Sequence, residues 1–132
     1  MKDAIRFSHV FLESFFKRIL DDGYASDKAF IVLGCAQVAT VFSLFNMLVV
    51  LGAKLPKPNF GFGLAFLLSL LLLFANYRII YGDGELESYR KRYQQIPKTR
   101  RLLGGMAVLA LVVLSIATLI VTTGMAAPFR VD

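Results

Sequence analysis

Only a few side chains in this sequence are of the types that act as nucleophiles, proton carriers or metal ligands. His9 is the only histidine and Cys35 the only cysteine, and neither belongs to a cluster with metal-ligand or catalytic spacing. We therefore expect His9 to be a solvated interfacial side chain and Cys35 to be a buried, unreactive thiol. The Gly-Asp-Gly-Glu segment at 82–85 lacks the alternating oxygen ligands of a calcium loop and predicts a turn before a helix. The sequence thus predicts no catalytic residue, no metal site and no cofactor.

A cluster of basic residues between 90 and 101 is the strongest candidate for a binding surface. Its members are Arg90, Lys91, Arg92, Lys98, Arg100 and Arg101. Each cation near an anionic leaflet contributes roughly 1 kcal/mol to binding, so we expect contact with anionic lipid headgroups or with a protein partner. The alternative, that these residues only set the topology of the chain, stays open. Nucleic acid is not an expected partner, because no single-strand-binding fold accompanies the cluster.

Three long apolar runs separate these polar segments and must position them. The runs span 29–53, 58–77 and 102–129, and none contains a charged residue. About 20 apolar residues in a helix cross the ~30 Å hydrocarbon core of a bilayer. The sequence therefore predicts an all-α membrane protein whose domain 23–132 holds three transmembrane helices near 29–52, 60–81 and 103–124. The loop 82–101 joins the last two spans.

The distribution of Lys and Arg predicts the orientation. With three spans, the N-terminal segment and the loop 82–101 share one side of the membrane, and that side carries all but three of the 15 basic residues. The three on the opposite side are Lys54, Lys57 and Arg130. Because Lys and Arg favour the cytoplasmic side, we expect a cytoplasmic N-terminus and an outside C-terminus.

Residues 1–22 predict a different, amphipathic helix. Phe11, Phe15, Phe16 and Ile19 fall on one half of a helical wheel, opposite a polar half that includes His9. This pattern is typical of a cytoplasmic helix lying in the plane of the headgroups. A helix that packs against the ends of the spans, or against a partner, has the same pattern, and this alternative stays open. A second short helix is predicted at 85–95, within the basic loop.

Small and polar residues inside the spans predict sites of helix–helix packing. They are Gln37, Asn46, Gly61, Ala65, Ser69, Ala107 and Ser115. Small residues allow helices to approach closely, and amide side chains form hydrogen bonds between helices in lipid. The packing partners are either the other spans of the same chain or a second copy in a homo-oligomer.

The chain resembles uncharacterised small three-pass bacterial membrane proteins in four features. These are an amphipathic helix, a hairpin of two spans, a Tyr-Arg-Lys-Arg-Tyr segment at 89–93 and a last span. The resemblance implies the architecture and a location in the inner membrane of a bacterium, and it implies no activity. We expect a non-enzymatic accessory or regulatory subunit at the cytoplasmic membrane face. The alternative is an oligomeric pore or holin-like permeabiliser. A transporter or a lipid-active enzyme is less favoured, because no carboxylate lies in any span and only scattered acids lie outside them.

Overall fold

Five helices make up the part of the chain that the structure describes. The structure is a computed structural model, and it describes residues 1–20, 23–52 and 58–126. The helices are α1 (Lys2–Leu20), α2 (Ala25–Val50), α3 (Pro58–Tyr81), α4 (Leu86–Gln95) and α5 (Lys98–Ala126). No strand occurs among these residues. The predicted all-α fold is confirmed.

Three of the helices are long and apolar enough to cross a membrane, at Ala25–Val50, Gly61–Tyr81 and Lys98–Ala126. The hydrocarbon core holds no water, so the backbone polar groups of a spanning segment must bond to one another, and a helix achieves this. The chain is therefore a multi-pass membrane protein. α2 and α5 begin before the apolar runs do, because their helical hydrogen bonding continues through a charged first turn.

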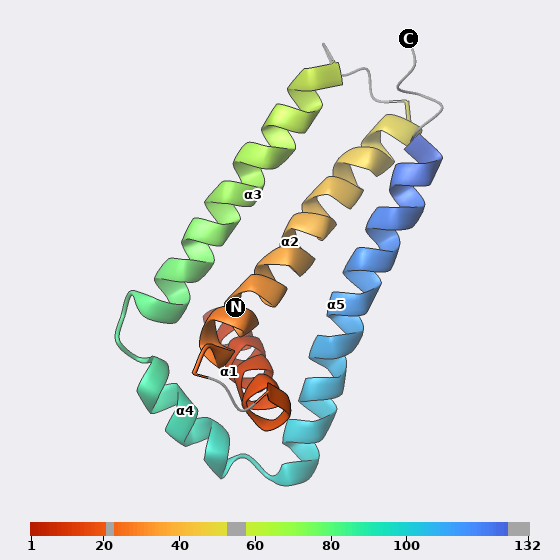
Figure 1. The fold of residues 1–132 in the computed structure, drawn as a ribbon. Helices are drawn as coiled ribbons and strands as arrows, with labels where there is room; N and C mark the ends of the chain where they lie inside the picture. Colours follow the sequence, from red (N-terminus) through yellow and green to blue (C-terminus); the bar gives the residue numbers. More distant parts are fainter. Residues whose placement is uncertain (21–22, 53–57, 127–132) are drawn as a thin grey trace.

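α2 is the central span of the bundle. It packs most extensively on α5 and less on α3, and α3 and α5 lie on opposite flanks of it (Figure 1). Gly34 lets α3 approach α2 closely, because a Cβ atom at this position would lie 2.6 Å from Leu73 Cδ2. The outward faces of α3 and α5 expose large apolar side chains such as Leu71 and Leu111, as expected for surfaces in contact with lipid.

Polar side chains inside the spans pair with one another across helices. Asn76 of α3 donates a hydrogen bond to Gln37 of α2. On the other side of α2, the Thr40 hydroxyl lies 3.2 Å from Ser115 Oγ of α5, and Asn46 Nδ2 lies 3.0 Å from Thr123 Oγ1. Such pairs stabilise contacts between membrane helices by about 0.6–2 kcal/mol.

The remaining predicted packing residues divide between contact and exposure. Gly61, Ala65 and Ser69 recur every fourth residue along α3 and are all buried within the single chain. Ala107 of α5 is exposed. The polar pairs and the buried row on α3 are contacts within one chain. Ala107 belongs to neither set, and an oligomer interface at this residue stays a prediction.

α1 does not run along the spans but lies across one end of the bundle, between α2, α4 and α5 (Figure 1). Two adjacent glycines of α5 receive it. A Cβ atom at Gly104 would lie 2.6 Å from the Phe7 ring, and one at Gly105 would lie 1.8 Å from the Phe11 ring. The absence of side chains at these positions allows both rings to pack directly on the α5 backbone. We call α1, residues 82–85, α4 and the first turn of α5 (98–101) the cap.

Candidate functional site

The polar face of α1 is buried inside the cap. Arg6, His9 and Glu13 recur at spacings of three and four residues, which places them on one side of the helix. Their exposed fractions are 6%, 0% and 3%. The expectation that His9 is a solvated side chain is therefore wrong. The end of α3, the start of α2 and α4 cover this face. The apolar residues of α1 pack in two clusters: Val10 contacts the end of α3 and α4, and Leu12 contacts α2 and α5.

Arg6 joins α1 to the turn between α3 and α4. Its Nη1 lies 2.6 Å from Glu85 Oε2 and its Nη2 lies 3.2 Å from Asp83 Oδ2. Its Nε donates to the carbonyl oxygen of Ile79 at 3.1 Å. The Gly-Asp-Gly-Glu segment is thus a turn, as predicted, and its two acids serve as ion-pair partners. Gly84 has a φ of +66°, which is a conformation that glycine adopts without strain.

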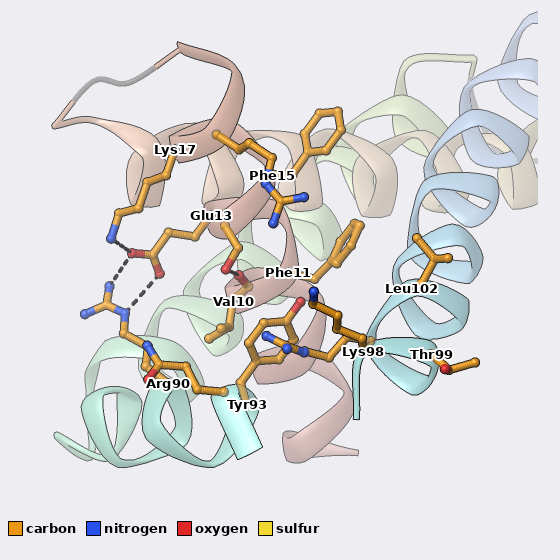
Figure 2. Close-up of a pocket in the computed structure, with 14 residues that line it drawn as sticks. Val10, Phe11, Glu13, Phe15, Lys17, Arg90, Tyr93, Lys98, Thr99 and Leu102 are labelled. Atoms are coloured by element: carbon orange, nitrogen blue, oxygen red, sulfur yellow. Dashed lines mark hydrogen bonds and ion pairs between the residues drawn. The ribbon is translucent and has the colours of Figure 1, made fainter. Parts of the chain in front are cut away.

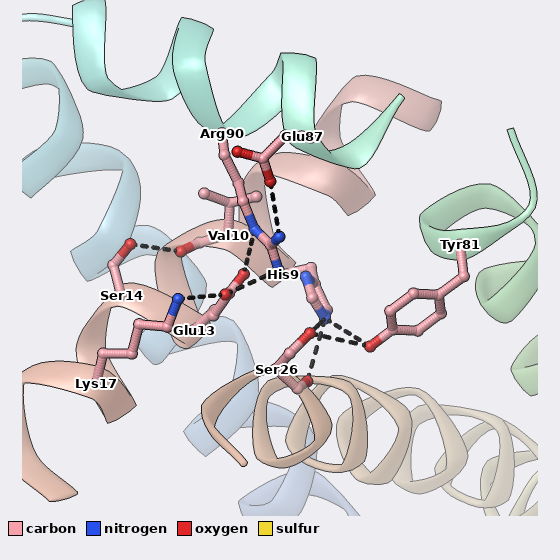
Figure 3. Close-up of polar contacts among 9 residues, drawn as sticks. All are labelled: His9, Val10, Glu13, Ser14, Lys17, Ser26, Tyr81, Glu87 and Arg90. Carbon is pink, nitrogen blue, oxygen red and sulfur yellow. Dashed lines mark hydrogen bonds and ion pairs between the residues drawn. The ribbon is translucent and has the colours of Figure 1, made fainter. Parts of the chain in front are cut away.

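Glu13 joins α1 to α4. It accepts two hydrogen bonds from Arg90, at 3.0 and 2.9 Å, and its Oε1 lies 2.9 Å from Lys17 Nζ (Figure 3). Arg90 also donates to Glu87 at 3.0 Å. Burial by itself would lower the pKa of Arg90, but the hydrogen bonds and charges of Glu87 and Glu13 raise the pKa above its ordinary value. A planar guanidinium paired with a buried carboxylate in this way is a strong, geometrically specific contact.

His9 joins α1 to the start of α2 and the end of α3. Its Nε2 lies 3.2 Å from the carbonyl oxygen of Ser26 and 3.3 Å from the Tyr81 hydroxyl, as Figure 3 shows. Because a carbonyl oxygen only accepts, Nε2 carries the hydrogen, and the buried Nδ1 has no hydrogen-bond partner among the described residues. Burial lowers the pKa of His9, against opposing contributions from Glu13, Ser26 and Asp27. Burial therefore disfavours the protonated imidazole.

A groove beside these contacts opens between α1, α4 and the start of α5 (Figure 2). It has a volume of about 670 Å³. One side is lined by Glu13, Lys17 and Arg90, which are bound to one another. The rest of the lining includes apolar and aromatic side chains, cations and uncharged polar residues; among the first two groups are Phe11, Phe15, Arg18, Tyr93, Lys98, Arg101 and Leu102.

The six basic residues predicted as a surface site therefore have different surroundings. Arg90 is engaged by Glu13 and Glu87. Lys98 and Arg101 line the groove, and Arg101 lies over the Tyr93 ring, with Cζ 5.7 Å from the ring centroid. The other three, Lys91, Arg92 and Arg100, are exposed and form no ion pair with a described residue.

The predicted lipid-facing side of α1 is partly covered. Phe11 and Phe16 are half-buried and pack beside the buried residues Leu12 and Ala29. Phe15 and Ile19 are exposed. α1 thus combines packing against the spans with an exposed apolar edge, and its position in the headgroup layer stays a prediction. The last two residues of the predicted segment, 21–22, lie outside the described residues.

Cys35 also differs from its prediction, because it is exposed on the side of α2 rather than buried. Residues 25–50 form one continuous helix, and no neighbouring helix covers this position. Among the described residues, no group of three or more His, Cys, Asp or Glu side chains is arranged to hold a metal ion.

The buried cluster of Arg6, His9 and Glu13 was not predicted from the sequence. One signal was present: three polar residues lie on one helical face, and residues of opposite charge that could pair with them lie at 83–90.

Comparisons with protein-family models, with curated proteins and with solved structures each found no match.

Proposed function

We propose that this protein is a non-enzymatic accessory subunit of a membrane assembly. The cap lies at the cytoplasmic face, where it contacts anionic lipid headgroups and an acidic surface of the partner. The observation that carries this proposal is the way in which the cap uses its charges: four of its five acids are held in internal ion pairs, and most of its cations remain exposed.

The internal ion pairs hold four acids of the cap. Asp83 and Glu85 pair with Arg6, and Glu13 and Glu87 pair with Arg90. Apart from Lys17, which binds Glu13, the exposed cations of the cap form no ion pair with a described residue. A surface with this balance favours anionic partners, because complementary potentials steer and orient encounters.

The same contacts support a non-enzymatic role. His9 is fully buried and hydrogen-bonded, so that no substrate reaches its imidazole in this conformation. Glu13 is saturated by Arg90 and Lys17. His9 and Glu13 thus hold α1 in place rather than face a substrate. They make the cap a preorganised surface, which lowers the entropic cost of binding.

Site-specific photo-crosslinking in the native host tests this proposal. A photoreactive amino acid replaces Ser88, an exposed residue of α4, and in a matched control it replaces Leu51, which is exposed at the opposite end of α2. We expect a discrete adduct with another protein from position 88 and not from position 51. Changing Lys91, Arg92 and Arg100 to Gln should lower the yield of the adduct.

Adducts only between copies of this chain, or equal adducts from both positions, would overturn the accessory-subunit proposal. The pore alternative is tested in parallel with purified protein in dye-loaded liposomes. An accessory subunit retains the dye, and rapid efflux at low protein-to-lipid ratios would favour the pore.

A further inference from the structure

The first turn of α5 has an unusual charge pattern. Lys98, Arg100 and Arg101 all lie in it, and it contains no acidic residue. The N-terminus of a helix carries a positive partial charge, which disfavours cations and favours anions. An anion bound at this end would interact favourably with the side chains and with the free backbone N–H groups of the first turn.

Arg101 gives independent evidence for an anion. Its Nε is buried and has no hydrogen-bond acceptor among the described residues. A buried donor without an acceptor is costly, so native structures normally supply one. Tyr93, over which Arg101 lies, has its pKa raised by burial, and the charges of Arg101 and Arg18 act in the opposite direction. Both guanidinium groups therefore lie in the electrostatic environment of this one ring.

The groove around Arg101 has a cationic part and an apolar part. Arg18, Lys98 and Arg101 line it and form no ion pair with a described carboxylate. Glu13, the acid in the lining, is bound by Lys17 and Arg90 (Figure 2). Phe11, Phe15 and Leu102 supply the apolar part. Leu102 begins the long apolar run of α5 and is 65% exposed, so the groove opens at the boundary between headgroups and hydrocarbon.

We propose that this groove binds one anionic phospholipid. Arg18, Lys98 and Arg101 hold the phosphate of the headgroup, and one acyl chain lies along Phe11, Phe15 and Leu102. Guanidinium and ammonium groups bind phosphate through charge-assisted hydrogen bonds, and the adjoining apolar surface distinguishes a lipid from a free phosphate ion. The proposal rests on the proposed function in one respect, since it requires the cap to lie in the headgroup layer.

Native mass spectrometry of the full-length protein in a mild detergent tests the site. The protein is titrated with phosphatidylglycerol and, separately, with phosphatidylcholine. A groove variant changes Arg18, Lys98 and Arg101 to Gln. A surface variant with the same loss of charge changes Lys91, Arg92 and Arg100 to Gln.

We expect the wild type to retain one phosphatidylglycerol in a saturable complex and to prefer it over phosphatidylcholine. The groove variant should bind about 100-fold more weakly, because each cation near an anionic lipid contributes roughly fivefold. The surface variant should bind nearly as the wild type does. The single change Arg101→Gln should weaken binding severalfold, and it serves as the test if circular dichroism shows that the triple variant is misfolded.

Equal losses in the two triple variants would overturn the groove site and leave the accessory-subunit proposal standing, because they would indicate a diffuse charge effect. Equal affinity for both lipids would also overturn it. Full displacement of the lipid by millimolar inorganic phosphate would show that the apolar part contributes nothing and that the site is one for free phosphate. Loss of the crosslinked partner with lipid binding intact would instead overturn only the proposed function.

Discussion

Replacing Glu13 with Gln should loosen α1 from the rest of the cap. The change keeps the size of the side chain but removes a carboxylate, 4% exposed, that binds both Arg90 and Lys17. Breaking a fully buried ion pair costs about 3–5 kcal/mol. Here Arg90 is 31% exposed and retains Glu87, so water and a second carboxylate compensate part of the loss. We expect the free energy that holds α1 in place to fall by about 2 kcal/mol.

Hydrogen exchange of the α1 backbone amides, measured by mass spectrometry in nanodiscs, gives this free energy directly. A loss of about 2 kcal/mol corresponds to roughly 30-fold faster exchange, since about 1.4 kcal/mol is a factor of ten. Glu87→Gln is the matched control, because its carboxylate also binds Arg90 but is 67% exposed. Exposed pairs contribute about 0–1 kcal/mol, so the control should change exchange by less than about fivefold. Equal effects of the two changes, or none in Glu13→Gln, would refute the assignment of Glu13 as the buried link.

Two further perturbations address the docking of α1, and a third addresses the packing of the spans. Burial lowers the pKa of His9 in the docked state, so the detached helix binds the proton more readily; docking should be full above about pH 6.5, the ordinary pKa, and weaken as the pH falls below it. Exchange of α1 measured from pH 7.5 to 5, with correction for intrinsic rates, should show this trend in the wild type and not in His9→Gln. Gly105→Val places a side chain where the Phe11 ring packs and should cost about 1–3 kcal/mol, seen as faster α1 exchange and rescued in part by Phe11→Ala. Asn76→Leu removes the hydrogen bond to Gln37 and should lower the free energy of unfolding in detergent by about 0.6 kcal/mol. Exchange of α1 should stay unchanged, and a large effect on it would contradict the interpretation that this pair stabilises only the contact between α2 and α3.

The spans were predictable because the length and apolar character of a run can be read directly from the sequence. An uncharged apolar run of sufficient length specifies a membrane helix whatever surrounds it, as α3 illustrates with its uncharged sequence from Gly61 to Tyr77. The short helix α4 was also predictable, since Leu86, Tyr89 and Tyr93 recur at helical spacing. The helix begins at Leu86 rather than at 85, and Glu85 is its N-cap residue. A difference of one residue is within the usual variation of assigned helix ends.

The burial of the polar face of α1 was not predictable in the same way. An amphipathic pattern says that one face avoids water, but it does not say what covers the opposite face. Arg6 and Glu13 are buried because partners from 83–90 reach them across more than 70 positions of sequence. Such pairing depends on how the spans bring the α3–α4 turn beneath α1. The role of Gly104 and Gly105 was not predictable for the same reason. These glycines matter because Phe7 and Phe11 of α1 pack on them, and the sequence does not show that α1 crosses α5 at this point.

Cysteine labelling of intact spheroplasts tests the central claim, that the cap lies at the cytoplasmic face, most directly. With the exposed Cys35 changed to Ser, one variant carries Ser88→Cys in the cap and another carries Leu51→Cys at the opposite end of α2. A membrane-impermeant maleimide should label the Leu51→Cys variant in intact spheroplasts and the Ser88→Cys variant only after permeabilisation. The reverse pattern would place the cap outside the cell and contradict the account.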